Sequence, residues 1–416
     1  LTGMGYAVGA QAYWVIVGEM IGIAASWGFI SRKLKRLSDE TDSITLPDVL
    51  AAKFDDRWHL IRGVAVAIIA VMVTTYVSAQ MVATGKAFSG FIGLDYRAGV
   101  IIGAVIIIGY TFVGGYKAVS YTDVVQGVLM LAGLIAVPLV AISAAGGWGQ
   151  MTATLNEYDP GFIDMFSVLD GSTAGFVAAV SFAAIGLPFL GVPQMLIRYM
   201  SARDDTELKK ARIVSITVLF IFLFGAVTAG IAGRALFPGL EDSEQVFPTL
   251  ASELFPPLLT GVLFVIVLSA IMSTVDSLLL LASSSIVRDT MQKILGNPSS
   301  DATLAGYGKV VTVIIGVIAV FVAVYMAENK LIFWFVLFSW SGLGAAFGPV
   351  VLALLYDRRT TGAGIVAGML GGFLTSLVWV QFFKAGAYGL YEAIPGFTVA
   401  AVATVVVSRM TGKQSR

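Results

Sequence analysis

The chain has 416 residues, of which 57% are hydrophobic and 12% charged, and its mean hydropathy is +0.88. A soluble globular domain is roughly 45–50% apolar and about 25% charged, so this composition indicates an all-α polytopic membrane protein. The 26 basic residues balance the 26 acidic ones, which argues against a nucleic-acid partner. Without cysteine, and with His59 as its only histidine, the sequence contains neither a disulfide framework nor a thiolate or histidine-ligated metal site.

Eleven apolar segments are predicted as membrane-spanning helices, because each is close to the ~20 residues that a span needs. Of the 26 basic residues, 21 fall in the loops on one side of this arrangement. The positive-inside rule places that side, together with the C-terminus, in the cytoplasm. The predicted segments are residues 8–30, 60–83, 98–116, 122–144, 173–197, 211–235, 257–287, 307–327, 331–356, 361–383 and 391–408.

The first segments already contain polar residues that need an explanation. Glu19 lies within the first predicted helix, where charged groups are rare. We expect it to pair with another polar group inside the bundle; the alternative is that it faces a cavity. The next loop predicts a short interfacial helix that Pro47 opens, with Asp48 in its first turn. Tyr76 and Gln80 share a helix face, and they either line a pocket or pack against neighbours.

Helix-breaking residues interrupt the chain at two places. Gly114 and Gly115 end the third segment, and a new helix begins near Asp123, which either caps it or supplies a carboxylate at the end of the bundle. In the fifth segment, Pro188 and Pro193 remove backbone hydrogen bonds. Interrupted spans often mark a transporter's binding site, because unwound backbone offers free carbonyls and amides. A simple proline kink is the alternative.

The seventh segment carries a single formal charge, Asp276, and an acid at such depth indicates a functional site. One face of the same helix carries small and hydroxyl side chains at i, i+3, i+4 and i+7, namely Ala270, Ser273, Thr274 and Ser277. Hydroxyl and carboxylate oxygens are ligands for a hard cation that sheds its water. The alternative is a helix-packing face whose Ser and Thr side chains bond to their own helix.

Several stretches together resemble the sodium/solute symporter family, over essentially the whole chain. The GG…TD..Q and MST blocks are specific to that family, and the last two stretches look like its proline branch. The matching stretches are TLPD (45–48), YTFVGGYKAVSYTDVVQ (110–126), GVPQMLIRYM (191–200), AIMSTVDSLLLLASS (270–284), WSGLGAAFGPVVL (340–352) and GLYEAIPGF (389–397).

The resemblance implies a leucine-transporter-like fold of two inverted repeats, forming a single transmembrane transporter domain over residues 1–416. The eleven spans would be all but the first two of the family's thirteen helices, so we expect the chain to start just past the unwound middle of the first core helix. Sodium would be bound by the backbone carbonyl of Ala270 and by the hydroxyls of Ser273 and Thr274.

Two further sets of residues follow from the same resemblance. A second cation site would involve Asp123, Asp276 and Ser277; separate structural roles for the two acids are the alternative. Substrate contacts would come from Tyr76, Phe189 and Pro193. The family's proline-binding aromatic pair reads Ile185 and Phe189 here and lacks its indole and phenol hydroxyl, which weakens the case for proline.

The function implied is sodium-coupled symport rather than catalysis, with Na⁺ as the only metal and coupling ion. The solute would be L-proline or a related amino acid, imported across the cell's inner (plasma) membrane by a multi-pass protein embedded in the lipid bilayer. A carboxylate or sugar-acid symporter is the alternative within this class. The alternative of another class is the solute-sensing membrane domain of a receptor kinase.

Overall fold

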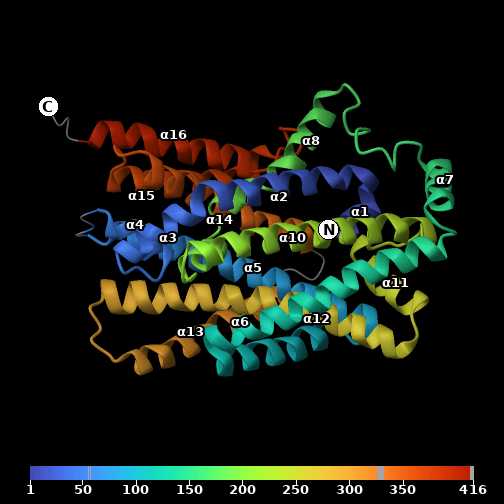
Figure 1. Ribbon diagram of the computed structural model, residues 1–416, viewed down its shortest axis with the longest axis horizontal. Helices are drawn as coiled ribbons and strands as arrows, with labels where there is room; N and C mark the ends of the chain where they lie inside the picture. The colour runs from blue at the N-terminus through green and yellow to red at the C-terminus, as the bar shows by residue number, and fades with distance from the viewer. Residues whose placement is uncertain (55, 57, 326–331, 413–416) are drawn as a thin grey trace.

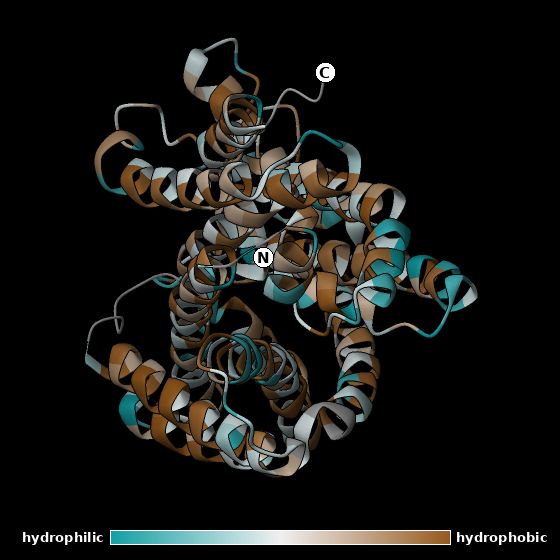
Figure 2. Cartoon of the chain, turned by 90° about the vertical axis from the view of Figure 1, so that its left-hand side faces the viewer, coloured by the Kyte–Doolittle hydropathy of each residue, from teal (hydrophilic) through white to brown (hydrophobic). Residues whose placement is uncertain are grey.

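The computed structural model describes residues 1–54, 56, 58–325 and 332–412, and most of the long helices run roughly along the longest axis of the molecule (Figure 1). Seen down that axis, the helices stand side by side, and hydrophobic residues make up much of their length (Figure 2). Within the described residues, eleven helices are long and apolar enough to cross a membrane. The predicted all-α architecture with eleven spans is therefore confirmed.

The helices occur in the following order. The first part of the chain contains α1 (Thr2–Val8), η1 (Gly9–Ala12), α2 (Tyr13–Ala25), η2 (Ser26–Ile30), α3 (Ser31–Glu40), α4 (Leu46–Ala52), α5 (Leu60–Ile92), α6 (Tyr96–Ala144), α7 (Trp148–Tyr158), α8 (Thr173–Ala184), η3 (Leu187–Leu190) and α9 (Pro193–Met200). The rest contains α10 (Asp205–Leu236), η4 (Ser243–Gln245), α11 (Val246–Leu254), α12 (Pro257–Ser284), η5 (Ser285–Ile294), α13 (Asp301–Tyr325), α14 (Ile332–Tyr356), α15 (Gly362–Val378), η6 (Trp379–Phe383) and α16 (Ala393–Thr411).

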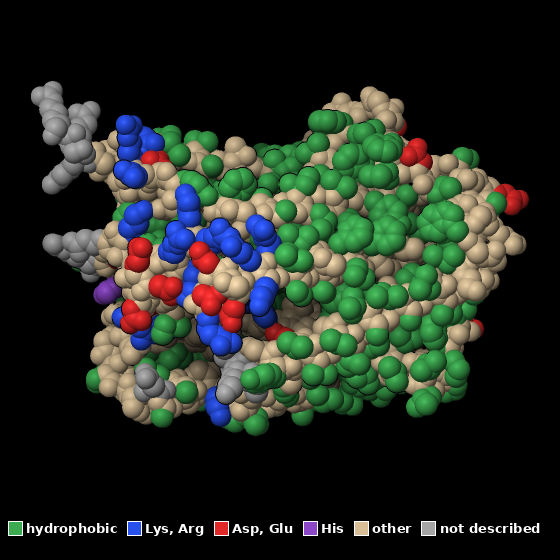
Figure 3. Space-filling view, viewed as in Figure 1, with side chains coloured by type: hydrophobic (Ala, Val, Ile, Leu, Met, Phe, Trp, Pro, Cys, Tyr) green, Lys and Arg blue, Asp and Glu red, His purple; other side chains and the backbone are tan. Residues whose placement is uncertain are grey.

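The two ends of the bundle differ in charge. Lys and Arg side chains, mixed with Asp and Glu, gather at the end where α16 finishes, and the middle of the molecule is covered by hydrophobic side chains (Figure 3). We call the end of the bundle where α16 finishes, and where these Lys and Arg side chains gather, the basic end. The apolar belt matches what a lipid environment requires, because charged groups there are costly.

Both predicted interruptions occur. Gly115 has φ 62° and ψ −179°, outside the helical region, so α6 divides into two spans, Tyr96–Gly115 and Val119–Ala144. The fifth predicted segment divides into α8, η3 and α9, and α9 begins at Pro193 because proline fits the first turn of a helix. The interfacial helix α4 also forms, and the Thr45 side chain caps it by accepting from the Asp48 backbone amide at 3.1 Å.

The helix α2 approaches the broken fifth span unusually closely. A Cβ atom added to Gly18 would lie 1.9 Å from the Ala183 carbonyl oxygen, and one added to Gly186 would lie 1.8 Å from the Gly18 oxygen. Only glycine at both positions permits this backbone contact, as at other small-residue helix crossings in membranes. The contact positions Glu19, the next residue of α2, beside η3.

Candidate functional site

A cavity of about 570 Å³, which we call the central cavity, is lined by α2, α5, η3, α12 and α14 and also by Leu1, α1, α6, α10, η4 and α11. Two of the three predicted substrate residues line it, Tyr76 from α5 and Phe189 from η3. Gln80 joins Tyr76 on the wall, so this pair faces a pocket. Pro193, by contrast, is buried at the start of α9 and does not line this cavity.

The three residues predicted to bind sodium come together on α12. Ser273 Oγ donates to the Ala270 carbonyl oxygen at 3.1 Å, and Thr274 Oγ1 donates to the same oxygen at 3.0 Å. Ala270 and Thr274 also line the central cavity. Three oxygen atoms of the type that a hard cation binds are thus gathered on one turn of helix. The hydroxyls bond to their own helix here, as the packing alternative also expects.

A second cavity, of about 670 Å³, opens at the basic end and is lined by Asp123, Arg198 and Ser277. Arg198 Nη2 donates to Asp123 Oδ2 and to Ser277 Oγ, at 2.8 Å in both cases. Both oxygens therefore surround one cationic nitrogen. Asp123 lies inside the helical span that starts at Val119, so it does not cap that helix.

Asp276, the residue before Ser277 on α12, accepts a hydrogen bond from a different side chain. Its side chain is fully buried, and Tyr110 donates to its Oδ2 at 3.0 Å while also hydrogen-bonding Thr122. Within the described part of the chain, Oδ1 of Asp276 and Oδ1 of Asp123 are buried without a hydrogen-bond partner. Each acid thus retains one buried oxygen that could accept a further ligand.

One turn of α12 separates the two cavities. Thr274 lines the central cavity and Ser277 lines the cavity at the basic end. Residues of the predicted sodium site, Ala270 and Thr274, thus line one cavity, and residues of the predicted second site, Asp123 and Ser277, line the other.

Glu19 does not behave as expected. It lines the central cavity and makes no hydrogen bond or ion pair with any residue that the structure describes. The expected pairing inside the bundle is therefore wrong, and the alternative, that Glu19 faces a cavity, is correct.

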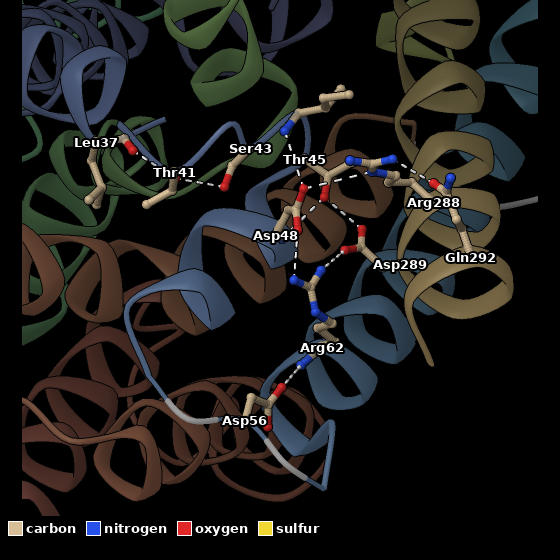
Figure 4. Close-up of polar contacts among 11 residues, drawn as sticks. Leu37, Thr41, Ser43, Thr45, Asp48, Asp56, Arg62, Arg288, Asp289 and Gln292 are labelled. Atoms are coloured by element: carbon tan, nitrogen blue, oxygen red, sulfur yellow. Dashed lines mark hydrogen bonds and ion pairs between the residues drawn. The ribbon is translucent and has the colours of Figure 1, made fainter. Parts of the chain in front are cut away.

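The sequence analysis missed a buried charge cluster at the basic end (Figure 4). Arg62 from α5 contacts Asp48 of α4 and Asp289 of η5, at 2.7 Å in both cases. Thr45 Oγ1 also donates to Asp289 Oδ2 at 2.6 Å. The four side chains tie together three segments that the sequence shows only as separate charged stretches. We call them the basic-end cluster.

Comparison with known proteins identifies the family. The chain matches the sodium:solute symporter family over residues 1–372. It belongs to that family. The high-affinity proline transporter PutP of Bacillus subtilis (strain 168) is 35% identical over 100% of this chain and 87% of its own length. The sodium/proline symporter of Staphylococcus aureus is 35% identical over 99% of this chain and 82% of its own length.

Two solved structures share the fold of this symporter. One is the substrate-bound outward-open state of a Na⁺-coupled sialic acid symporter, with TM-score 0.81 and 17% identity over 98% of this chain and 87% of that one. The other is MhsT in complex with L-phenylalanine, with TM-score 0.54 and 15% sequence identity; the match covers 98% of this chain and 96% of that one. The predicted leucine-transporter-like fold is thereby confirmed, and the protein is a multi-pass, sodium-coupled symporter.

Proposed function

We propose that this symporter imports L-proline, or a closely related amino acid, together with Na⁺. The observation that supports it is the central cavity, which Tyr76 and Phe189 share with Ala270 and Thr274. A solute in that cavity would lie against the helix turn that carries the sodium ligands. The names of the two relatives described above, both at 35% identity, make proline the first solute to test.

The proposed ion site uses the Ala270 carbonyl and the hydroxyls of Ser273 and Thr274. A hydroxyl that now donates to Ala270 can rotate and present a lone pair to Na⁺. Bound Na⁺ would raise solute affinity by a coupling free energy that is reciprocal, so the solute would raise Na⁺ affinity equally. Rocking of the bundle would then expose the pair to the other side.

We further propose a second cation site at Asp123, Asp276 and Ser277. Arg198 now places its guanidinium group between Asp123 and Ser277, so a second Na⁺ would compete with this side chain. The two carboxylates each keep one unpartnered oxygen, which supports a role beyond their present hydrogen bonds.

The basic end is proposed to face the cytoplasm, with the C-terminus inside. The support is the concentration of Lys and Arg at that end and their scarcity at the other (Figure 3). We propose transport without chemical conversion of the solute, in the cell's inner membrane. A carboxylate or sugar-acid symporter, or a solute sensor, remains the competing assignment that the following experiment separates.

The test is uptake of labelled L-proline by the full-length protein in proteoliposomes. An inward Na⁺ gradient should drive accumulation, and replacing Na⁺ with K⁺ should abolish it. Unlabelled amino acids, short carboxylates and sugar acids are added as competitors. Uptake that follows a carboxylate or a sugar acid but not proline would overturn the amino-acid assignment. Solute binding without any Na⁺-driven accumulation would favour a sensor.

A further inference from the structure

We infer that a small pocket at the basic end binds the phosphate of an anionic phospholipid. The pocket has a volume of about 270 Å³, and its wall shares no residue with the two cavities described above. The inference goes beyond the proposed function, because it concerns the lipid around the symporter and holds for any solute.

The pocket lies at the level where a membrane span ends. Its wall includes Tyr356, the last residue of the span Phe335–Tyr356, and Arg358, two residues further on. Lys53, which directly follows the interfacial helix α4, forms another part of the wall. The Tyr356 side chain is half exposed, and tyrosine is typical of the membrane–water interface. Lipid headgroups occupy this level.

Three basic side chains line the pocket, and they come from three separate segments. Lys33 lies on α3, Lys53 follows α4, and Arg358 follows α14. None of the three forms an ion pair with the residues that the structure describes. The fold therefore places three positive charges around one small pocket, where they repel one another, and an anion bound between them would relieve that repulsion.

The two lysines are held at the wall by groups that leave their charge unmatched. Lys53 Nζ donates to the Leu354 carbonyl oxygen at 2.7 Å, and this is one of the three hydrogen bonds that an ammonium can donate. Lys33 Nζ lies 3.4 Å from the centroid of the Tyr356 ring, in a cation–π contact. A phosphate oxygen can accept from both ammonium groups, and the Arg358 guanidinium can bind phosphate with two parallel hydrogen bonds.

The acid on the described wall, Asp357, is engaged elsewhere. Its Oδ2 accepts from Arg409 Nη2 at 2.8 Å, and its Oδ1 accepts from the Arg359 backbone amide at 3.0 Å. Because Arg409 brings a positive charge of its own, its ion pair with Asp357 is neutral as a whole. The wall therefore keeps a net positive charge, which suits a phosphate.

The surroundings of the pocket favour a lipid over a soluble phosphate. The Tyr356 hydroxyl donates to the Phe29 carbonyl oxygen at 2.8 Å, and the Phe29 side chain is 59% exposed. An exposed apolar side chain beside a basic pocket can contact the glycerol and the first part of an acyl chain. Basic pockets between membrane-spanning helices are known to hold anionic lipid headgroups. An inorganic phosphate would use only the charges, whereas a phospholipid uses both features.

The first experiment measures thermal unfolding of the purified full-length symporter in detergent. Dioleoyl phosphatidylglycerol or dioleoyl phosphatidylcholine is added; the two lipids share their chains and their phosphate but differ in net charge. A ligand that binds the folded state raises Tm, so phosphatidylglycerol should raise Tm more than phosphatidylcholine does. The combined variant Lys33→Gln, Lys53→Gln and Arg358→Gln should lose this difference.

The matched control removes three basic side chains at the same end that do not line the pocket. Lys209→Gln, Lys210→Gln and Arg212→Gln change exposed positions on α10 and alter the net charge equally. This variant should keep the difference between the two lipids. An equal response of the two combined variants to phosphatidylglycerol overturns the inference, because it would show a general effect of surface charge.

The second experiment measures the affinity for phosphatidylglycerol by native mass spectrometry. It should fall roughly 10- to 100-fold in the combined pocket variant, because each cation near an anionic headgroup contributes about fivefold. Arg358→Gln alone, an exposed change, decides if the combined variant does not fold; it should lower the affinity about threefold or more. Arg358→Lys, which keeps the charge, should bind nearly as well as the unmodified protein. An unchanged affinity in Arg358→Gln overturns the inference.

Soluble anions separate the lipid from a free phosphate. Inorganic phosphate and glycerol 3-phosphate, added in place of the lipid, should raise Tm much less than phosphatidylglycerol. If inorganic phosphate stabilises the unmodified protein as strongly, and this effect is lost in the pocket variant, the assignment to a lipid is overturned. Neither experiment requires transport, so a failure of lipid binding and a failure of proline uptake are separate results.

Discussion

Ser273 and Thr274 show why a hydroxyl pair on one helix turn can have two roles. Both donate to the Ala270 carbonyl oxygen, and this bond to the helix's own backbone needs no partner from elsewhere. The same oxygens lie where an ion would reach them, since Thr274 lines the central cavity. Removing the two hydroxyls should therefore change the stability of the helix little, but it would remove two ligands of a bound cation.

The first prediction follows from this difference. Ser273→Ala combined with Thr274→Ala should raise the Na⁺ concentration for half-maximal uptake roughly 10-fold or more, because two of the three proposed ligands are lost. The measurement is uptake against Na⁺ in proteoliposomes. Thr398→Ala is the matched control, because it removes an equivalent bond to the Ile394 carbonyl at 2.8 Å on the exposed face of α16. An unchanged Na⁺ dependence in the double variant would rule out the site.

Arg198 occupies the proposed second cation site. Its Nη2 donates to both Asp123 and Ser277, so a cation bound there would have to displace it. Arg198→Gln should therefore make uptake depend more steeply on Na⁺, and Asp123→Asn added to it should remove that gain. The measurement is the Hill coefficient for Na⁺. Arg36→Gln breaks an exposed pair with Asp205 at the same end and should change nothing. A Hill coefficient that does not rise would leave Arg198 with a structural role.

At the scale of elements, the contact between α2 and the fifth span depends on the absence of a side chain. Gly18→Ala would push a methyl group to 1.9 Å from the Ala183 carbonyl oxygen. Because backbone cannot move aside as a side chain can, we expect a loss of stability of roughly 1–3 kcal/mol and strongly reduced uptake. Thermal unfolding in detergent is the measurement. Gly63→Ala is the control, since its Cβ would meet nothing within 4 Å. Equal melting temperatures for the two variants would contradict the close packing.

The basic-end cluster gives a second prediction at this scale. Arg62 joins Asp48 and Asp289 with side chains between 0% and 11% exposed. Arg62→Gln removes the cation that lies 2.7 Å from both buried carboxylates, and leaves Asp48 with the longer contact to Arg288 at 3.8 Å and Asp289 with its hydrogen bond from Thr45. Losing one partner of a buried ion pair typically lowers the free energy of unfolding by about 3–5 kcal/mol. The variant should unfold at a clearly lower temperature. Arg409→Gln breaks the more exposed ion pair with Asp357, and it should lower the free energy of unfolding by less than about 1 kcal/mol. Similar losses in both variants would mean that burial does not strengthen the cluster.

The whole molecule allows a direct test of orientation, because the sequence contains no cysteine. Arg358→Cys places a thiol at the basic end, and Glu157→Cys places one on α7 at the opposite end (Figure 1). In intact cells a membrane-impermeant maleimide should label position 157 only, and position 358 should react only after the membrane is opened. The reverse labelling pattern would show that the basic end faces outward, against the positive-inside rule.

Much of the architecture follows from local features of the chain. The spans are read from hydropathy because every backbone group in a bilayer must be satisfied within a helix. Gly115 breaks α6 and Pro193 starts α9 because each acts on its own backbone, whatever surrounds it. The gathering of Ala270, Ser273 and Thr274 is likewise a consequence of helical periodicity alone.

What the sequence by itself could not determine is which side chains meet between helices. Arg62 pairs with Asp289, 227 residues further along the chain, and Arg198 donates to Ser277, 79 residues further along. Glu19 lines a cavity, although the sequence suggested that it pairs inside the bundle. Such contacts depend on how each helix is rotated and how closely its neighbours approach. Hydropathy and spacing determined the spans and their breaks, and packing at small residues such as Gly18 determined where the charges lie.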